Sequence, residues 1–383
     1  TTTGGQTYDT AVTLYADTTL SGSGLSAGAI DMKSYALTLS EVGTGSVTGI
    51  ISGTGALTMS GAGALSLAGA NTYSGGTTVS AGILKADVPT VGAPSSITAA
   101  AFGRGAVTVA DGAALDLNGK AIANALAIQG TGVSSSGAVF NSEATQATLS
   151  GAVILDGDSL IRTYGPLMIS GTLNAALGAG ASALTVSNSV TGTGLITLSG
   201  TVGGTNPISS LSVENALSLA ASVKTKGAQT YSGAVTLGAD TTLTTTNSSV
   251  TFGGTVDSDT TTRALTIAAG TGDIDFDGAV GDTHALGQLQ IVSGTDVSVA
   301  AGLVTDNADI DFSGVTGTTT LAGAIATGGG DLIGAGTDFA NTGTIATGGG
   351  AVNLNAQTGT IDIDANVTTL GGAFTATGAS VFD

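Results

Sequence analysis

A short phrase of alternating apolar and small polar residues, closed by glycine, returns along the whole chain. Examples are Gly55-Ala-Leu-Thr-Met-Ser-Gly61, Gly63-Ala-Leu-Ser-Leu-Ala-Gly69, Gly105-Ala-Val-Thr-Val-Ala-Asp-Gly112 and Leu195-Ile-Thr-Leu-Ser-Gly200. Alternation predicts short strands with one buried face, and turns every 8 to 12 residues or so are typical of a chain that winds into stacked coils. We therefore expect an all-β protein, a parallel β-helix (β-solenoid) that forms an elongated, single-stack rod.

The composition supports a folded chain without disulfides. The 383 residues include 63 Gly, 4 Pro and no Cys or Trp. A hydrophobic fraction of 42% and a mean hydropathy of +0.41 are too high for a disordered segment. The absence of Cys excludes a disulfide framework and thiolate metal sites.

The charge balance excludes several partners. Eight basic residues stand against 27 acidic ones, so the formal net charge is -19. Such a chain repels nucleic acid and anionic lipid surfaces. The sequence has no apolar run long enough to span a membrane, so we expect no membrane insertion of this segment. It opens without a signal peptide, and we expect it to be a fragment of a longer protein.

Longer echoes predict one continuous solenoid over residues 1–383. Gln6-Thr-Tyr8 and Ala16-Asp-Thr-Thr-Leu20 return as Gln229-Thr-Tyr231 and Ala239-Asp-Thr-Thr-Leu243, displaced by 223 residues. Ile325–Gly330 recurs at Ile345–Gly350, a shift of 20. With coils of about 20 residues and about 4.8 Å each, the rod has about 18 coils and a length of about 85 Å. The proline-containing stretches Val88–Pro94 and Gly203–Pro207 are expected to be loops outside the ladders.

One segment carries a more specific signal. Over Gly55–Asp87 the chain resembles the passenger-associated repeat of bacterial autotransporters, whose signature is the core Asn71-Thr-Tyr-Ser-Gly-Gly-Thr77. Residues 105–173 look like the sequence that follows this repeat, and the remainder is similar in style to haemagglutinin-like adhesins. We thus divide the predicted solenoid into three segments. Residues 1–54 form the first coils, residues 55–173 form repeat-like coils, and residues 174–383 form more acidic, haemagglutinin-like coils.

The resemblance implies a right-handed parallel β-helix passenger, exported by a type V route and displayed outside a Gram-negative cell. The function expected from it is structural: a stalk or display segment of a surface adhesin or extracellular fibre, and not an enzyme. Expected partners are further coils of the same polypeptide, or copies of the chain end to end or side by side, with a host, cell-surface or glycan receptor. The export route and the receptor are left open.

Acidic strands in the second half offer a candidate calcium site. In these strands the isoleucines and phenylalanines are expected to point inward and the carboxylates outward. Carboxylates on neighbouring coils, about 4.8 Å apart, could converge on Ca²⁺, and the strand register decides whether they do. The alternative is a solubilising face that prevents lateral aggregation. The candidate ligands are Asp273, Asp275, Asp277, Asp309, Asp311, Asp362 and Asp364.

Catalysis is the other alternative. His284, the only histidine, lies near Asp282, but a solvated loop residue explains it without a nucleophile or oxyanion site. Asp156 and Asp158 fit a turn before they fit a catalytic pair. A β-helix lyase or hydrolase acting on polysaccharides would need an acidic groove with basic and aromatic neighbours, and bases and rings are scattered here. We therefore predict no catalytic residues and no required cofactor.

Two further side-chain types have structural interpretations. Tyr8, Tyr73 and Tyr231 share a Thr-Tyr context and are expected to pack at coil corners with their hydroxyls outward. Threonine-rich runs such as Thr241–Thr246 lack regular spacing, so no flat threonine array is expected.

Overall fold

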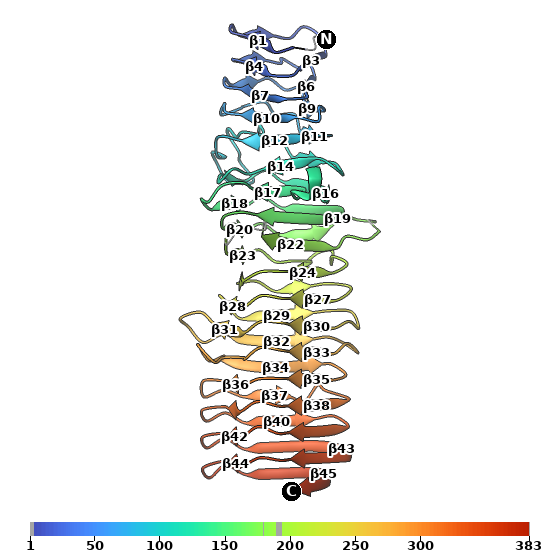
Figure 1. The fold of residues 1–383 in the computed structure, drawn as a ribbon, viewed down its shortest axis with the longest axis vertical. Coiled ribbons are helices and arrows are strands. Elements are labelled where there is room, and N and C mark those ends of the chain that lie inside the picture. Colours follow the sequence, from blue (N-terminus) through green and yellow to red (C-terminus); the bar gives the residue numbers. More distant parts are fainter. Residues whose placement is uncertain (1–3, 179, 189–193, 383) are drawn as a thin grey trace. The chain divides into compact units, whose positions relative to one another are not determined.

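The computed structural model describes residues 4–178, 180–188 and 194–382. Over these ranges the chain consists of short strands joined by bends, and the helical content is a single 3-10 turn, η1 (Val133–Ser135). Among the described residues the strands pair in parallel, as in β1 with β4 or β43 with β45. The predicted parallel β-solenoid is confirmed (Figure 1).

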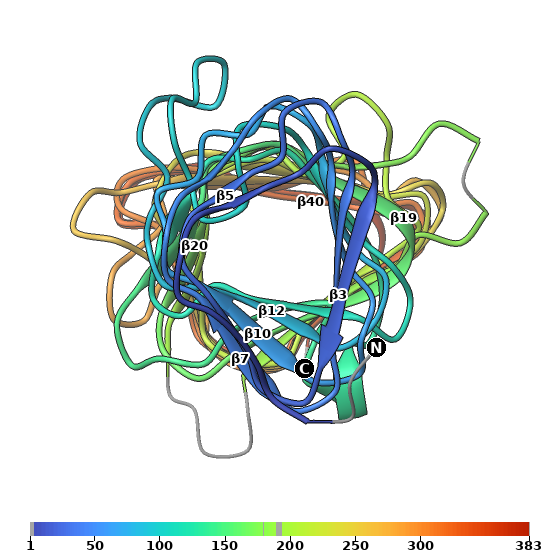
Figure 2. The ribbon, with the colours of Figure 1, turned by 90° about the horizontal axis from the view of Figure 1, so that it is seen from above.

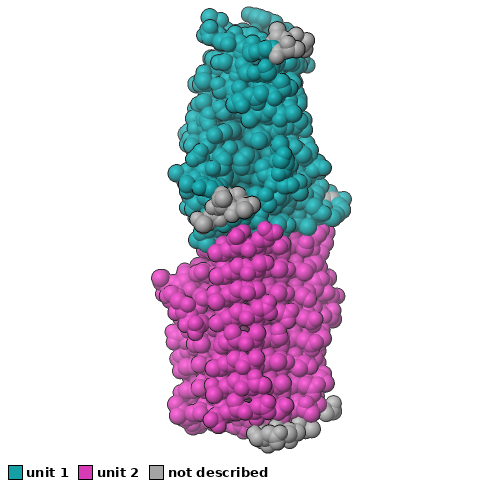
Figure 3. Space-filling view, in the orientation of Figure 1, with its two compact units in different colours: residues 1–200 teal, residues 201–383 magenta. Residues whose placement is uncertain are grey.

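The chain forms two compact units, residues 1–200 and 201–383, coloured separately in Figure 3. We describe each unit by itself. Three expectations remain predictions: the single continuous stack, its right-handed sense, and its division into residues 1–54, 55–173 and 174–383.

Unit 1 has three parallel strand columns, A, B and C. Figure 2 shows strands of column A lying over one another, coil on coil. Column A contains β1 (Gln6–Tyr8), β4 (Leu25–Ala27), β7 (Thr44–Val47), β10 (Ala64–Leu67), β12 (Ile83–Ala86), β14 (Ala114–Asp116), β17 (Val139–Asn141), the second half of β19 (Val153–Thr163) and β22 (Leu184–Asn188). Column B contains β3 (Thr18–Gly22), β6 (Leu37–Glu41), β9 (Leu57–Met59), β11 (Thr77–Val79), β13 (Val107–Val109), β16 (Leu126–Gly130), the first half of β19 and β21 (Leu173–Ala175). Column C contains β2 (Val12–Thr13), β5 (Ile30–Asp31) and β8 (Ile51–Ser52), then β15 (Ala121–Ile122), β18 (Ala147–Leu149), β20 (Leu167–Ile169) and β23 (Ile196–Leu198).

Unit 2 also has three columns, D, E and F. Column D contains β24 (Leu211–Val213), β27 (Gln229–Tyr231), β30 (Val250–Phe252), β33 (Ile274–Phe276), β35 (Val297–Val299), β38 (Thr318–Leu321), β41 (Asp338–Asn341) and the second halves of β43 (Val352–Ile363) and β45 (Phe374–Phe382). Column E contains β26 (Val223–Lys224), β29 (Thr241–Thr244), β32 (Ala264–Ala268), β34 (Gln288–Ser293), β37 (Ile310–Phe312), β40 (Leu332–Ala335) and the first halves of β43 and β45. Column F contains β25 (Leu217–Leu219), β28 (Val235–Leu237) and β31 (Val256–Ser258), then β36 (Leu303–Val304), β39 (Ile325–Ala326), β42 (Ile345–Ala346) and β44 (Val367–Thr368).

The core of each unit follows the alternation read from the sequence. In β6, Leu37 and Leu39 are fully buried, and Thr38 between them faces outward. The inward side chains expected in the acidic strands are likewise buried, as Ile274 and Phe276 show in β33. A fully buried aliphatic or aromatic side chain stabilises a fold by about 1.5–3 kcal/mol. The inner columns therefore supply the main stabilisation of both units.

Column D contains an aromatic stack. Tyr231, Phe252 and Phe276 occupy the same register position on three successive coils. The ring centroids lie 5.1 Å and 4.9 Å apart, with interplanar angles of 16° and 2°. All three rings are buried to within 1% exposure. The parallel ladder itself imposes this stacking, because equivalent side chains on successive coils are held one strand spacing apart.

One carboxylate lies inside unit 1. Glu41 has 0% exposure, and its Oε2 and Oε1 accept the backbone N–H groups of Leu25 at 2.6 Å and Gly43 at 2.7 Å. Glycine makes room for it, because a Cβ on Gly45 would lie 2.4 Å from Oε2. The two N–H donors hold the charged oxygens in place of water.

A threonine column runs down the outside of column B. Consecutive parallel pairs join five threonines, one on each of five coils, namely Thr19, Thr38, Thr58, Thr78 and Thr108. This single column is not the flat array of threonine-rich runs considered from the sequence, and that expectation stays a prediction. The steps along the column are 19, 20, 20 and 30 residues.

The predicted proline loops lie outside the ladders. Residues 91–96 are exposed, and Val91 pairs with Ala99 in an antiparallel bridge away from the parallel columns. Residues 203–207 join the bridge residues Val202 and Ile208. The first of these insertions explains the long 30-residue step of the threonine column.

Candidate functional site

The strand register separates the three acidic strands. Asp275 lies in column D, between Thr251 and Ser298 of the neighbouring coils. Asp311 lies in column E, between Gln290 and Ile333. Asp362 is in column D, but Ser298, Thr320 and Ala340 lie between it and Asp275. The register therefore does not bring these carboxylates together on neighbouring coils.

Most of the candidate ligands have protein donors. Asp275 accepts the Ser298 hydroxyl at 2.8 Å. Asp311 accepts the Gln290 side-chain amide at 3.2 Å and the Ser313 backbone N–H at 2.8 Å. Asp277, Asp362 and Asp364 are exposed. Within the described ranges there is no group of three or more His, Cys, Asp or Glu side chains placed to hold a metal ion.

Asp273 and Asp309 belong to a set that we call the inter-coil aspartates. In each, a carboxylate oxygen accepts a backbone N–H from the following coil. The set, with its donors, is Asp17 with Ala36 at 2.9 Å, Asp116 with Ser142 at 3.2 Å, Asp158 with Ala183 at 2.8 Å, Asp240 with Ala264 at 2.9 Å, Asp257 with Thr283 at 2.9 Å, Asp273 with Asp296 at 3.3 Å, Asp296 with Thr318 at 2.7 Å, Asp309 with Asp331 at 2.8 Å, Asp331 with Ala351 at 2.7 Å, and Asp338 with Thr360 at 2.8 Å. These carboxylates bond successive coils to one another.

Sequence reasoning missed this role, although a signal was present. The echoed phrase Asp-Thr-Thr-Leu places Asp17 and Asp240 directly before a column strand, and both carboxylates make the same inter-coil bond. Aspartate at a strand start can satisfy a backbone donor that the ladder leaves unpaired.

Acid should weaken the bond at Asp338. The Thr360 backbone N–H, and then its hydroxyl, lower the pKa of Asp338 below 3.8. A folded-state pKa below the unfolded one stabilises the fold above about pH 4 and loses that effect as the pH falls through the folded-state pKa. We expect Asp338→Asn to lower the melting temperature at about pH 7, and this deficit to shrink as the pH falls through the folded-state pKa of Asp338. The exposed Asp306→Asn is the control; a deficit that persists at low pH would contradict the assignment.

The residues considered for catalysis are exposed. His284 and Asp282 lie in an exposed loop, where Asp257 Oδ1 accepts the backbone N–H groups of Thr283 at 2.9 Å and His284 at 3.2 Å. Asp156 and Asp158 are exposed where β19 shifts register: Leu155 pairs with Ile128, and Ser159 pairs with Gly130. The predicted turn is thus a bulge inside a long strand.

The core Asn71–Thr77 builds an internal hydrogen-bond network. Asn71 is fully buried, and its Oδ1 accepts the Ile51 backbone N–H at 2.7 Å while its Nδ2 donates to the Ala101 carbonyl at 2.6 Å. Tyr73 is also fully buried, with its hydroxyl 2.6 Å from Thr77 Oγ1. Thr77 donates to the Phe102 carbonyl at 2.9 Å. These side chains join coils to one another and are not available to a ligand.

Residues 52–86 match the family model described as the passenger-associated-transport-repeat. This segment is thus a passenger-associated repeat. No curated protein and no solved structure matches. Together with the parallel β-solenoid, the repeat supports an autotransporter passenger β-helix, and it implies a secreted or cell-surface protein. The family is a structural repeat, which favours a non-enzymatic role.

The prediction that the tyrosine hydroxyls point outward was wrong for two tyrosines. Tyr73 and Tyr231 have 0% and 1% exposure, and the Tyr231 hydroxyl donates to Gln229 Oε1 at 3.0 Å. Burial raises the pKa of both phenols. Tyr8, which is half-buried, makes the equivalent bond to Gln6 Oε1 at 3.0 Å. The echoed Gln-Thr-Tyr phrase thus encodes an internal Gln–Tyr pair.

Replacing a glycine of the repeat core should destabilise unit 1. A Cβ on Gly75 would lie 2.2 Å from the Gly55 carbonyl oxygen, which cannot move without breaking the coil stack. We expect Gly75→Ala to cost about 1–3 kcal/mol in the free energy of unfolding, measured by chemical denaturation. Gly180→Ala, with no atom within 4 Å of its Cβ, is the matched control. Equal stability of the two variants would contradict the steric account.

No helix in the described part of the chain has the length and apolarity needed to cross a bilayer.

Proposed function

We propose that the chain is a structural display segment of a secreted bacterial surface adhesin or extracellular fibre, positioned outside a Gram-negative cell. The observation that carries the proposal is the passenger repeat at residues 52–86. Its characteristic side chains, such as Asn71 and Tyr73, are buried inside the strand columns. In such a segment the fold itself performs the function, because stacked coils give reach and stiffness.

The strand columns support this function energetically. Backbone ladders and buried apolar columns join the described coils to their neighbours, and the inter-coil aspartates add bonds between some of them. Stability then accumulates coil by coil, so that a long stack tolerates variation in individual coils. We further propose that residues 1–383 form one continuous stack, which joins further coils of the parent polypeptide or other copies of the chain.

Electron microscopy of the negatively stained chain tests the proposal. We expect rods about 85 Å long, from about 18 coils with a rise of about 4.8 Å each. Filaments would favour end-to-end association and bundles side-by-side association. Compact particles, or clear turnover above buffer in a screen on pectin-like and other glycans, would overturn the proposal.

Surface display is tested separately in cells. We expect the chain, kept within its parent polypeptide, to be cleaved by protease added to intact bacteria, whereas a periplasmic marker protein stays intact. Protection of the chain until the cells are lysed would contradict an external location.

A further inference from the structure

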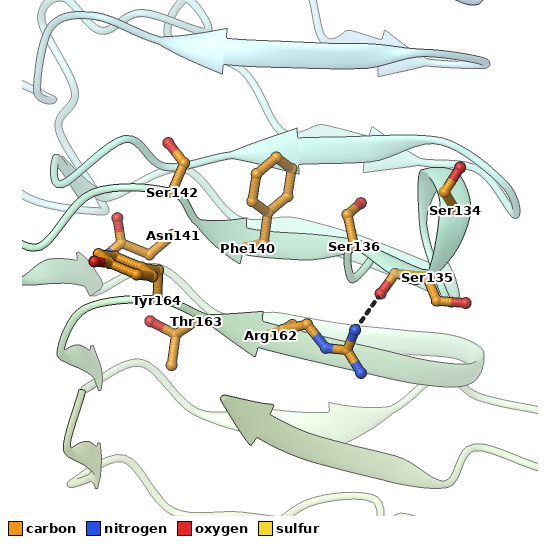
Figure 4. Close-up of a pocket in the computed structure, with 9 residues that line it drawn as sticks. All are labelled: Ser134, Ser135, Ser136, Phe140, Asn141, Ser142, Arg162, Thr163 and Tyr164. Atoms are coloured by element: carbon orange, nitrogen blue, oxygen red, sulfur yellow. Dashed lines mark hydrogen bonds between the residues drawn. The ribbon is translucent and has the colours of Figure 1, made fainter. Parts of the chain in front are cut away.

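A hollow on the outside of unit 1 differs in chemistry from the rest of the surface. Its volume is about 270 Å³, and it lies between the serine turn around η1 and the ends of β17 and β19 (Figure 4). Phe140 and Arg162 line it from equivalent register positions on successive coils of column A. Ser142 and Tyr164 line it at the ends of the same two strands.

Arg162 has no ionic partner among the residues that the structure describes. Its Nη1 donates to the Ser135 carbonyl at 2.9 Å and its Nε donates to Ser187 Oγ at 3.4 Å. A guanidinium has five N–H donors, so donors remain for a bound group. Arg263, in contrast, is occupied by Asp259, with Nη2–Oδ2 and Nε–Oδ1 distances of 2.9 Å and 3.1 Å.

The lining is unusual for so acidic a chain. None of the residues that line this hollow is acidic, although the sequence has 27 acidic residues and only 8 basic ones. A second hollow in unit 1, lined by Asp111 and Asp158, shows the opposite composition. Two carboxylates lie next to the lining: Asp116 is 4% exposed and accepts the Ser142 hydroxyl at 2.7 Å, and the exposed Glu143 follows Ser142 in the chain. Arg162 is the one charged side chain of the lining itself, which suits an anion.

Two aromatic side chains, Phe140 and Tyr164, line the hollow together with Arg162. Phe140 takes an outward position that Ser66, Lys85 and Asp116 occupy on the preceding coils. Tyr164 is 44% exposed. Aromatic faces pack against the C–H faces of sugar rings, serine hydroxyls exchange hydrogen bonds with sugar hydroxyls, and an arginine fork binds a carboxylate with two parallel bonds.

We propose that this hollow binds one carboxylate-bearing sugar ring at the end or edge of a glycan. Its volume is just below the range of about 300–1,000 Å³ typical of drug-sized ligands, which suits one ring. Arg162 binds the carboxylate, Phe140 and Tyr164 contact the ring, and the serines bind its hydroxyls. The site goes beyond display: a chain that failed to bind sugar would still serve as a stalk.

Titration calorimetry on the full chain tests the site with a matched pair of sugars. D-Glucuronate and D-glucose share a ring and differ in the carboxylate, and sodium sulfate supplies an anion without a ring. We expect glucuronate to bind about tenfold or more tightly than either, because a charge-assisted fork and ring contacts are both required. Equal binding of glucose, equal binding of sulfate, or no glucuronate binding would overturn the proposal.

Variants assign the contacts. We expect Arg162→Gln to weaken glucuronate binding about tenfold or more, and Arg162→Lys to fall between, because lysine keeps the charge and loses the fork. Arg104→Gln is the matched control, since Arg104 is exposed and does not line the hollow. If loss of the Ser135 contact unfolds the Arg162 variants, Tyr164→Ala replaces them, with weaker glucuronate binding and unchanged sulfate binding expected. Unchanged glucuronate affinity in a folded variant contradicts the site.

Discussion

Phe252→Ala is expected to produce the largest loss of stability in unit 2. Phe252 is fully buried between Tyr231 and Phe276, with ring centroids 5.1 Å and 4.9 Å away. Truncating a buried phenylalanine costs about 3–5 kcal/mol, and each lost aromatic pair adds about 0.5–1.5 kcal/mol. Phe252 loses two such pairs, so we expect a loss of about 4–8 kcal/mol in the free energy of unfolding.

Hydrogen exchange locates this effect along the chain. Because stability in a solenoid is shared mainly between neighbours, we expect backbone protection to fall in β27, β30 and β33 and to persist in distant coils. Phe252→Leu, which keeps an apolar side chain, should lose much less. Phe374→Ala is the control, because Phe374 is 40% exposed. A comparable loss in the free energy of unfolding for Phe374→Ala would show that the aromatic stack adds no stability.

Glu41→Ala is expected to produce a similarly large effect in unit 1. The substitution leaves the N–H groups of Leu25 and Gly43 without the carboxylate oxygens that now lie 2.6 Å and 2.7 Å away. An unsatisfied buried donor costs about 1–3 kcal/mol, and two donors are affected, so we expect a loss of about 2–6 kcal/mol. Glu41→Gln keeps one acceptor oxygen and should fall between the parent chain and Glu41→Ala.

Chemical denaturation measures the loss in the free energy of unfolding, and hydrogen exchange over residues 20–65 measures the local loss of backbone protection. Glu143→Ala is the control, because Glu143 is exposed in the same unit. A Glu41→Ala chain more stable than the parent would show that desolvation of the carboxylate outweighs its two hydrogen bonds, and would contradict the prediction.

The alternating pattern predicted much of the fold, because it reports directly on which face of a strand is buried. The same pattern contains an unused signal for Glu41, because Leu37, Leu39 and Glu41 share one face of β6. A charged carboxylate is normally expected on the outer face, and this expectation conflicts with the inward position of Glu41 in the pattern. Gly45 leaves the space that the buried carboxylate needs, and only the stacking of the coils shows that Gly45 faces Glu41.

Features that depend on register across coils could not be predicted. The separation of Asp275 from Asp311 depends on which column each strand joins, and coil lengths vary too much for sequence spacing to determine it. The hollow at Arg162 likewise combines a serine turn with two strand ends that become neighbours only after winding. The buried tyrosine hydroxyls were missed because their acceptors lie on the inner face of the same repeat.

The inter-coil aspartates give each unit a chemical polarity. Their exposed members, such as Asp17 and Asp240, accept a hydrogen bond from a backbone N–H of the coil that follows. The buried acceptors Glu41 and Asn71 take theirs from the coil before, Leu25 and Ile51. A coil that is added after an existing coil can donate its backbone N–H to an aspartate carboxylate that is already in place. A coil that is added in front must itself supply the aspartate. The two ends of such a stack are therefore unequal templates for growth, as the two ends of a polar filament are.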